Sequence, residues 1–82
     1  MTSRNVVVNL AHDTERAMAE LVSLAGEYTS RIHLNCQNKR INAKSIMGVM
    51  TLVSYSGDAI TVTAEGSDEE EAVEAISTFF AG

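Results

Sequence analysis

The sequence has little positive charge. It contains six Lys and Arg residues against eleven Asp and Glu residues, which gives a net charge of −5. Because clustered Lys and Arg side chains hold the phosphate backbone of nucleic acids, this balance argues against a nucleic-acid partner. Lys39, Arg40 and Lys44 form the one local basic cluster, which we interpret as ordinary solvated charge. A phosphate or an acidic protein surface is the alternative partner of this cluster.

Disulfides, membrane spans and low-complexity tracts are absent as well. Cys36 has no second cysteine to pair with, which excludes an internal disulfide. No apolar run approaches the roughly 20 residues of a membrane span, and no amino-terminal segment has the pattern of a signal peptide. We therefore expect a cytoplasmic protein with no membrane partner. Apolar residues make up 45% of the 82 residues, which predicts a single folded domain over residues 1–82.

The apolar pattern predicts a strand, a helix and a hairpin in the first half of the chain. Alternation along VVVNL predicts a strand over residues 6–10, and later steps of three and four residues predict an amphipathic helix over residues 16–25. The segments RIHLNC, QNK and RIN predict a β-hairpin over residues 31–42. The strand residues expected to face the interior are Val6, Val8, Leu10, Ile32, Leu34 and Cys36.

The second half is predicted to add a short helix, a strand and a longer helix. KSIMGVMTLV has helical spacing, AITVTAE alternates like a half-buried strand, and SDEE opens the last helix through a capping box of Ser67 with Glu70. The order β-α-β-β-α-β-α predicts an α+β two-layer open-faced sandwich. The residues expected to face the core are Ile46, Val49, Met50, Val53, Ile60, Val62, Ala64, Ala72, Val73, Ile76, Phe79 and Phe80.

Ser45 stands where the short helix begins, and two roles are open for it. Its hydroxyl can cap the helix by accepting a hydrogen bond from a free backbone N–H, which contributes roughly 1 kcal/mol. It can also be a phosphorylation site, because a phosphate there meets free N–H groups and the positive end of the helix dipole.

Met47 and Met50 follow Ser45 on the same short helix. The apolar row of this helix leaves little room for both, so we expect at least one to reach solvent and offer an adaptable docking patch for a protein. The alternative, in which both methionines fill gaps in a small core, has equal support from the spacing.

The other polar residues give no catalytic or metal-binding motif. His12 lies in the first loop and could accept a phosphate beside Arg16, although a lone loop histidine is more often simply solvated. His33 is expected at the surface and Cys36 in the core, without the spacing of metal ligands. The acidic run of residues 68–71 fits the first turn of a helix. We therefore expect a protein that is not an enzyme and holds no cofactor or metal.

The run NAKSIMGVMTL, residues 42–52, resembles the regulatory-serine helix of HPr and of its catabolite-repression paralogue Crh. HPr is the histidine-containing phosphocarrier of the bacterial sugar phosphotransferase system. The order of elements, the segments YTSRIHL and AEGSDEEEAVEAI and the chain length are similar too, so the resemblance covers nearly the whole sequence. It implies an HPr-like fold, in which three helices cover one face of a four-stranded antiparallel sheet.

The resemblance has one departure, at the phosphocarrier signature. The family places a histidine two residues before an Arg-Pro pair, whereas here Thr14 stands two residues before Arg16 and Ala17 replaces the proline. The phosphoacceptor histidine is thus missing, as in Crh-like proteins, and a threonine phosphoester would be too stable to relay phosphate. His12 lies nearby. The alternative is therefore a phosphocarrier that uses His12 with Arg16 between the general phosphotransferase enzyme and sugar-specific components.

For Ser45, the resemblance implies reversible phosphorylation by a bifunctional HPr kinase/phosphorylase. The modified family member then acts as corepressor for a catabolite control transcription factor. Ile46, Met47 and Met50 match the family's exposed docking patch, and Arg16 matches an arginine that contacts partners. Our hypothesis is a regulatory adaptor that is phosphorylated on Ser45 and recognised by protein partners through the short helix.

Overall fold

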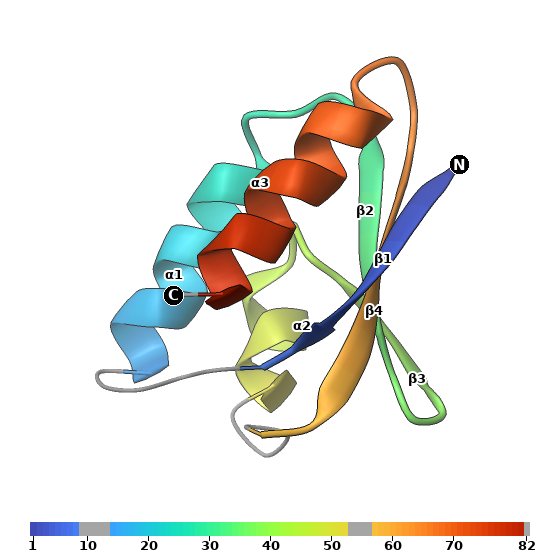
Figure 1. The fold of residues 1–82 in the computed structure, drawn as a ribbon. Coiled ribbons are helices and arrows are strands. Elements are labelled where there is room, and N and C mark those ends of the chain that lie inside the picture. Colours follow the sequence, from blue (N-terminus) through green and yellow to red (C-terminus); the bar gives the residue numbers. More distant parts are fainter. Residues whose placement is uncertain (9–13, 53–56, 82) are drawn as a thin grey trace.

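Four strands form one antiparallel sheet, and three helices lie on one of its faces (Figure 1). A computed structural model describes residues 1–8, 14–52 and 57–81 of the chain. The predicted order of elements and the open-faced fold are confirmed. The elements are β1 (Thr2–Val7), α1 (Thr14–Ala25), β2 (Arg31–Cys36), β3 (Lys39–Asn42), α2 (Ile46–Met50), β4 (Ala59–Glu65) and α3 (Glu69–Ala81).

The strand order β1-β4-β2-β3 places β1 and β3 at the two edges of the sheet. β4 is antiparallel to both of its neighbours, so that Thr61 stands opposite Asn5 on one side and Asn35 on the other. Because successive residues of a strand point to opposite faces, each strand has a covered row and an uncovered row. In β2 the covered row is Ile32, Leu34 and Cys36, and the uncovered row is Arg31, His33 and Asn35.

The core lies between the covered face of the sheet and the helices. α1 contributes Met18, Leu21 and Ala25, which are fully buried and follow the steps of three and four residues that predicted this helix. On α3, Phe80 is buried, and Phe79 is half-buried beside it with the two rings edge to face and their centroids 5.5 Å apart. The other predicted core residues of β4 and α3 that are confirmed are Ile60, Val62, Ala64, Ala72, Val73 and Ile76.

The prediction for the first strand was wrong in its bounds. β1 spans Thr2–Val7 instead of residues 6–10, and Leu10 lies outside the described residues. The covered positions near the start of β1 are polar because they pair with α3 at the margin of the sheet. The Thr2 hydroxyl donates to the Glu69 carboxylate at 2.6 Å, and Arg4 Nη1 lies 2.6 Å from Glu74 Oε2. These partners come from the far end of the chain, so no local apolar pattern marks this half of the strand.

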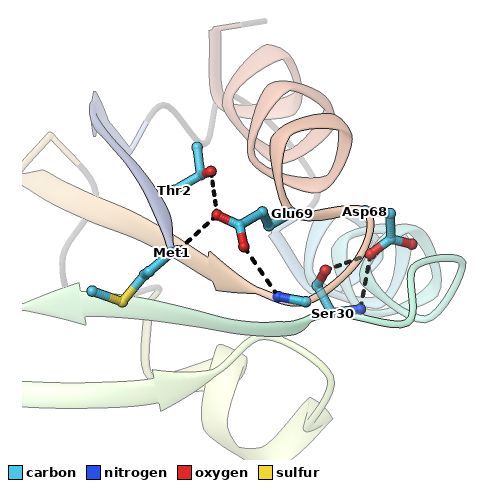
Figure 2. Close-up of polar contacts among 6 residues, drawn as sticks. Met1, Thr2, Ser30, Asp68 and Glu69 are labelled. Carbon is cyan, nitrogen blue, oxygen red and sulfur yellow. Dashed lines mark hydrogen bonds and ion pairs between the residues drawn. The ribbon is translucent and has the colours of Figure 1, made fainter.

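The predicted capping box at the last helix was also wrong by one residue. The Ser67 hydroxyl lies 3.2 Å from the Thr29 hydroxyl, and it is Glu69 whose carboxylate reaches back to accept from the Gly66 N–H at 3.4 Å. Glu69 also accepts from Thr2 and lies 2.9 Å from the Met1 ammonium group (Figure 2). The contacts to β1 therefore explain why Glu69, and not Glu70, accepts the hydrogen bond from the loop before α3.

Asp68 ties the loop before α3 to the loop before β2 (Figure 2). Its carboxylate accepts from the backbone N–H groups of Thr29 and Ser30, both at 2.9 Å, and from the hydroxyl of Ser30, which is fully buried. These hydrogen bonds lower the pKa of Asp68 to about 2, with the Ser30 hydroxyl as the largest cause and the Thr29 N–H as the next. The acidic turn predicted to complement the helix dipole thus also anchors a neighbouring loop.

We expect the protein to lose stability in acid because of these two carboxylates. The pKa of Asp68 falls from 3.8 to about 2, and that of Glu69 from 4.5 to about 2, chiefly through the Thr2 hydroxyl. A folded-state pKa below the unfolded one adds stability above the unfolded pKa, and this contribution disappears as the pH falls toward the folded pKa. The free energy of unfolding, from urea titrations, should therefore fall between about pH 4.5 and about pH 2.

Asp68→Asn tests the origin of this acid sensitivity. At neutral pH the variant should be less stable than the wild type, and the difference should shrink as the pH approaches about 2. Glu71→Gln is the matched control, because it removes an exposed carboxylate from the same turn. An equal pH dependence in wild type and Asp68→Asn would contradict the role of Asp68.

Candidate functional site

Ser45 is the amino-terminal cap of α2. Its backbone is extended, with φ −106° and ψ 116°, and its hydroxyl accepts a hydrogen bond from the Gly48 N–H at 3.3 Å. The Ser45 carbonyl accepts the first helical bond from the Val49 N–H at 2.9 Å. The capping role predicted for Ser45 is confirmed.

A tight turn at Asn42 directs the chain from β3 into α2. The Asn42 side-chain oxygen accepts from the Lys44 N–H at 2.9 Å, and the Asn42 carbonyl accepts from the Ser45 N–H at 3.0 Å. Asparagine favours such turns because its short side chain can bond to the backbone two residues on. Lys44 holds a second loop in place, because its ammonium group donates to the Tyr28 carbonyl at 2.6 Å. Sequence analysis missed this bond, because no local pattern joins two residues 16 positions apart.

The orientation of α2 differs from the one that its apolar spacing predicted. Val49 and Leu52 are fully buried, as expected for Val49, but Ile46 is 45% exposed and Met50 36% exposed. Val53 lies outside the described residues. Gly48 explains the rotation, since a Cβ atom there would lie 3.3 Å from the Ile41 side chain. The absence of a side chain lets the helix approach β3 with this side, which turns Ile46 and Met50 away from the core.

Ile46, Met47 and Met50 form an exposed apolar surface on the outer side of α2, here called the α2 patch. Met47 is 83% exposed, the highest value among the described large apolar residues. Positions three and four residues apart on a helix are neighbours, so Met50 lies beside both Met47 and Ile46. Ser45, half-buried, precedes the patch directly. The structure therefore brings together a hydroxyl and an adaptable apolar surface, and the prediction that at least one methionine reaches solvent is confirmed.

Of the two residues of the alternative phosphocarrier site, Arg16 lies within the described residues and His12 does not. Arg16 is an exposed residue near the start of α1, and its Nε atom lies 3.3 Å from Glu20 Oε1 one turn later. α1, which carries Arg16, packs against α2.

The described residues hold no arrangement suited to a metal or to a reactive thiol. No three His, Cys, Asp or Glu side chains within them lie where they could share a metal ion. Burial raises the pKa of the Cys36 thiol, and Asp58 raises it further, so this cysteine is disfavoured as a nucleophile. Cys36 is fully buried, as its place in the alternating pattern predicted. Among the same residues, no helix has the length and hydropathy of a membrane span.

Comparison with known proteins decides the family. The family model described as "PTS HPr component phosphorylation site" matches residues 2–82. The chain belongs to the HPr family. Among curated relatives, the HPr-like protein Crh of Halalkalibacterium halodurans is 42% identical over 80 residues, which cover 96% of this chain and 95% of the relative. The phosphocarrier protein HPr of Cupriavidus necator is 39% identical over 66 residues, which cover 80% of this chain and 74% of the relative.

Solved HPr structures share the fold. The crystal structure of a phosphocarrier protein HPr from Bacillus anthracis superposes with a TM-score of 0.87 at 39% identity, covering 96% of this chain and 95% of that one. The HPr-like resemblance stated from the sequence is therefore confirmed for family and fold. Both HPr and Crh relatives fit the chain, so the family alone does not assign a role to Ser45, the α2 patch or Arg16.

Proposed function

We propose that this HPr-family chain is a regulatory adaptor, without enzymatic activity, that is reversibly phosphorylated on Ser45 in the cytoplasm. Protein partners would recognise the α2 patch together with Arg16. By resemblance, the modifying enzyme is an HPr kinase/phosphorylase, and the partner that binds the phosphorylated protein is a catabolite control transcription factor or another regulatory protein. The Crh relatives at 42% and 38% identity support this direction.

The observation that carries the proposal is the position of Ser45 beside the α2 patch. Its hydroxyl begins the helix whose outer side exposes Ile46, Met47 and Met50. A phosphoryl group would add up to two negative charges at the edge of this apolar surface. Partners with a cation near an apolar pocket would then bind more tightly, and partners with a purely apolar or acidic surface would bind less well. The fold itself needs no rearrangement for such a switch.

The direct test is incubation of the protein with ATP and an HPr kinase/phosphorylase, followed by mass spectrometry. We expect the mass of one phosphoryl group to be added and fragmentation to place it on Ser45. Subsequent incubation with inorganic phosphate should reverse the modification if the enzyme is bifunctional. An unmodified protein, or a phosphate on another residue, would contradict the proposal. The chain would then be an interaction domain that shares the HPr fold but is not regulated through Ser45.

A phosphocarrier that uses His12 with Arg16 is the second candidate function. The HPr relatives of similar identity and the exposed position of Arg16 on α1 favour it. Incubation with phosphoenolpyruvate, the general phosphotransferase enzyme and labelled phosphate distinguishes the two. Acid-labile label on His12 that passes on to sugar-specific components would support the carrier and contradict the adaptor, whereas the adaptor predicts no such label.

Met47→Gln is expected to impair partner binding without affecting the fold. Because Met47 is 83% exposed, the substitution should change the free energy of unfolding by less than about 0.5 kcal/mol. The loss of a large apolar contact should weaken binding of the phosphorylated protein to its partner roughly tenfold, measured by calorimetry. Val7→Gln is the matched control, since Val7 is a 55% exposed apolar residue of β1. Equal weakening by both variants would show that the α2 patch has no special part in binding.

A further inference from the structure

Positive charge is concentrated in one continuous stretch of the chain. Residues 28–57 contain no Asp or Glu but four of the six Lys and Arg residues, which gives this stretch a charge of +4. The rest of the chain, with two cations and eleven acidic residues, has a charge of −9. The four cations of the stretch are Arg31, Lys39, Arg40 and Lys44.

The ion pairs of the described residues follow the same division. All of them use cations outside residues 28–57: the Met1 ammonium with Glu69, Arg4 with Glu74, and Arg16 with Glu20. Across residues 1–8, 14–52 and 57–81, none of the four cations of the stretch lies within ion-pair distance of a described carboxylate. Their charge is therefore not neutralised by the described part of the fold, although the protein as a whole is acidic.

Two of these cations flank His33 on the uncovered face of the sheet. Arg31 and His33 are two residues apart in β2 and so point to the same face. His33 stands opposite Asn42 in β3, and Arg40, two residues before Asn42, is its diagonal neighbour. Arg40 Nη2 lies 3.3 Å from His33 Nδ1. We call Arg31, His33 and Arg40 the β2–β3 basic surface.

The electrostatics of this surface favour an anionic ligand. Burial, Arg40 and Arg31 all lower the pKa of His33, so the imidazole is neutral near pH 7 and can accept from the Arg40 guanidinium. Glu65 faces the same side from β4, opposite Arg31, but lies beyond ion-pair distance from it. An anion placed between the two guanidinium groups would gain attraction from both and would also stabilise the imidazolium form of His33.

We propose that the β2–β3 basic surface is a second contact site, separate from the α2 patch, that binds a carboxylate-rich segment of a protein partner. Charge complementarity identifies the occupant, since two of the four unneutralised cations, Arg31 and Arg40, lie here on the face of the sheet that no helix covers (Figure 1). Planar guanidinium groups pair with carboxylates through two parallel hydrogen bonds. Because the groups are spread over two strands, several carboxylates along an extended segment fit them better than one compact anion.

Nuclear magnetic resonance of the full-length protein tests this proposal with a capped hexaglutamate peptide as probe. We expect amide shifts on β2 and β3, shifts of the His33 ring resonances, and a higher pKa of His33 in the presence of the peptide. Arg40→Gln should weaken binding of the peptide about fivefold. Arg4→Gln, which removes the same charge from β1, should weaken it by less than about twofold. Hexalysine at the same ionic strength should produce no such shifts.

Several results would overturn the proposal. Absence of shifts at His33, shifts confined to the α2 patch, or equal losses from Arg40→Gln and Arg4→Gln would each contradict a specific surface on β2 and β3. Inorganic phosphate is titrated as a further probe at matched ionic strength. Saturation of the His33 shifts at lower concentrations of phosphate than of peptide carboxylate would identify a compact phosphate site and exclude the carboxylate-binding role.

Discussion

Ser45→Ala is expected to abolish kinase-dependent phosphorylation and to lower the free energy of unfolding by about 1 kcal/mol. The two effects have separate causes. Ser45 carries the one hydroxyl at the start of α2 to which a phosphoryl group can be transferred. Without it, the Gly48 N–H also loses its hydrogen-bond acceptor, which lies 3.3 Å away. Mass spectrometry after incubation with the kinase measures the first effect, and urea titration measures the second.

Two further substitutions at Ser45 separate the hydroxyl from the cap. Ser45→Asp keeps a side-chain acceptor for the Gly48 N–H and adds one negative charge, so it should retain stability and reproduce part of the effect of phosphorylation on partner binding. Ser45→Thr keeps both a hydroxyl and a cap. Ser67→Ala is the control at an exposed serine just before α3. Phosphate on Ser45→Ala at the wild-type level would show that the modified residue has been assigned wrongly.

Most of the fold could be predicted because its buried elements carry complete local patterns. β2 alternates strictly between covered and uncovered residues, and α1 repeats its apolar residues at helical steps. β1 shows where this approach fails. Its first half is polar on the covered side, because Thr2 and Arg4 pair with carboxylates of α3 about 70 residues later in the chain. A local pattern cannot report a partner at that separation.

In the candidate site, too, features set by nearby residues could be predicted, whereas features set by tertiary contacts could not. The cap at Ser45 depends on a turn and three following residues, so the sequence predicted it. The direction of the α2 patch depends on the close approach of Gly48 to Ile41 in β3, which only the folded chain reveals. The spacing therefore placed Ile46 in the core, whereas the family resemblance implied an exposed residue, which is where the structure places it. Its contact with a partner stays a prediction.

Gly66→Ala should be among the most destabilising single substitutions in the chain, at about 3 kcal/mol of unfolding free energy. Gly66 joins β4 to α3 with φ +156°, in the loop that Asp68 ties to Ser30. A Cβ atom at residue 66 would lie 2.6 Å from the Ser30 hydroxyl oxygen and 2.7 Å from the Ser30 Cα atom. Ser30 is fully buried and held by Asp68, so it cannot move aside without breaking those bonds.

Gly57→Ala separates the collision at Gly66 from backbone strain alone. Gly57 has φ +95°, but an added Cβ atom there would meet none of the described residues within 4 Å, so the cost should be near 1 kcal/mol from conformation. Urea titration of both variants, with circular dichroism as the probe, gives the two values. A larger loss from Gly57→Ala than from Gly66→Ala would mean that the loop before α3 yields easily and that Ser30 and Asp68 do not hold it. The opposite order would show that this contact, distant from the α2 patch, is a principal determinant of the stability of the fold that presents Ser45.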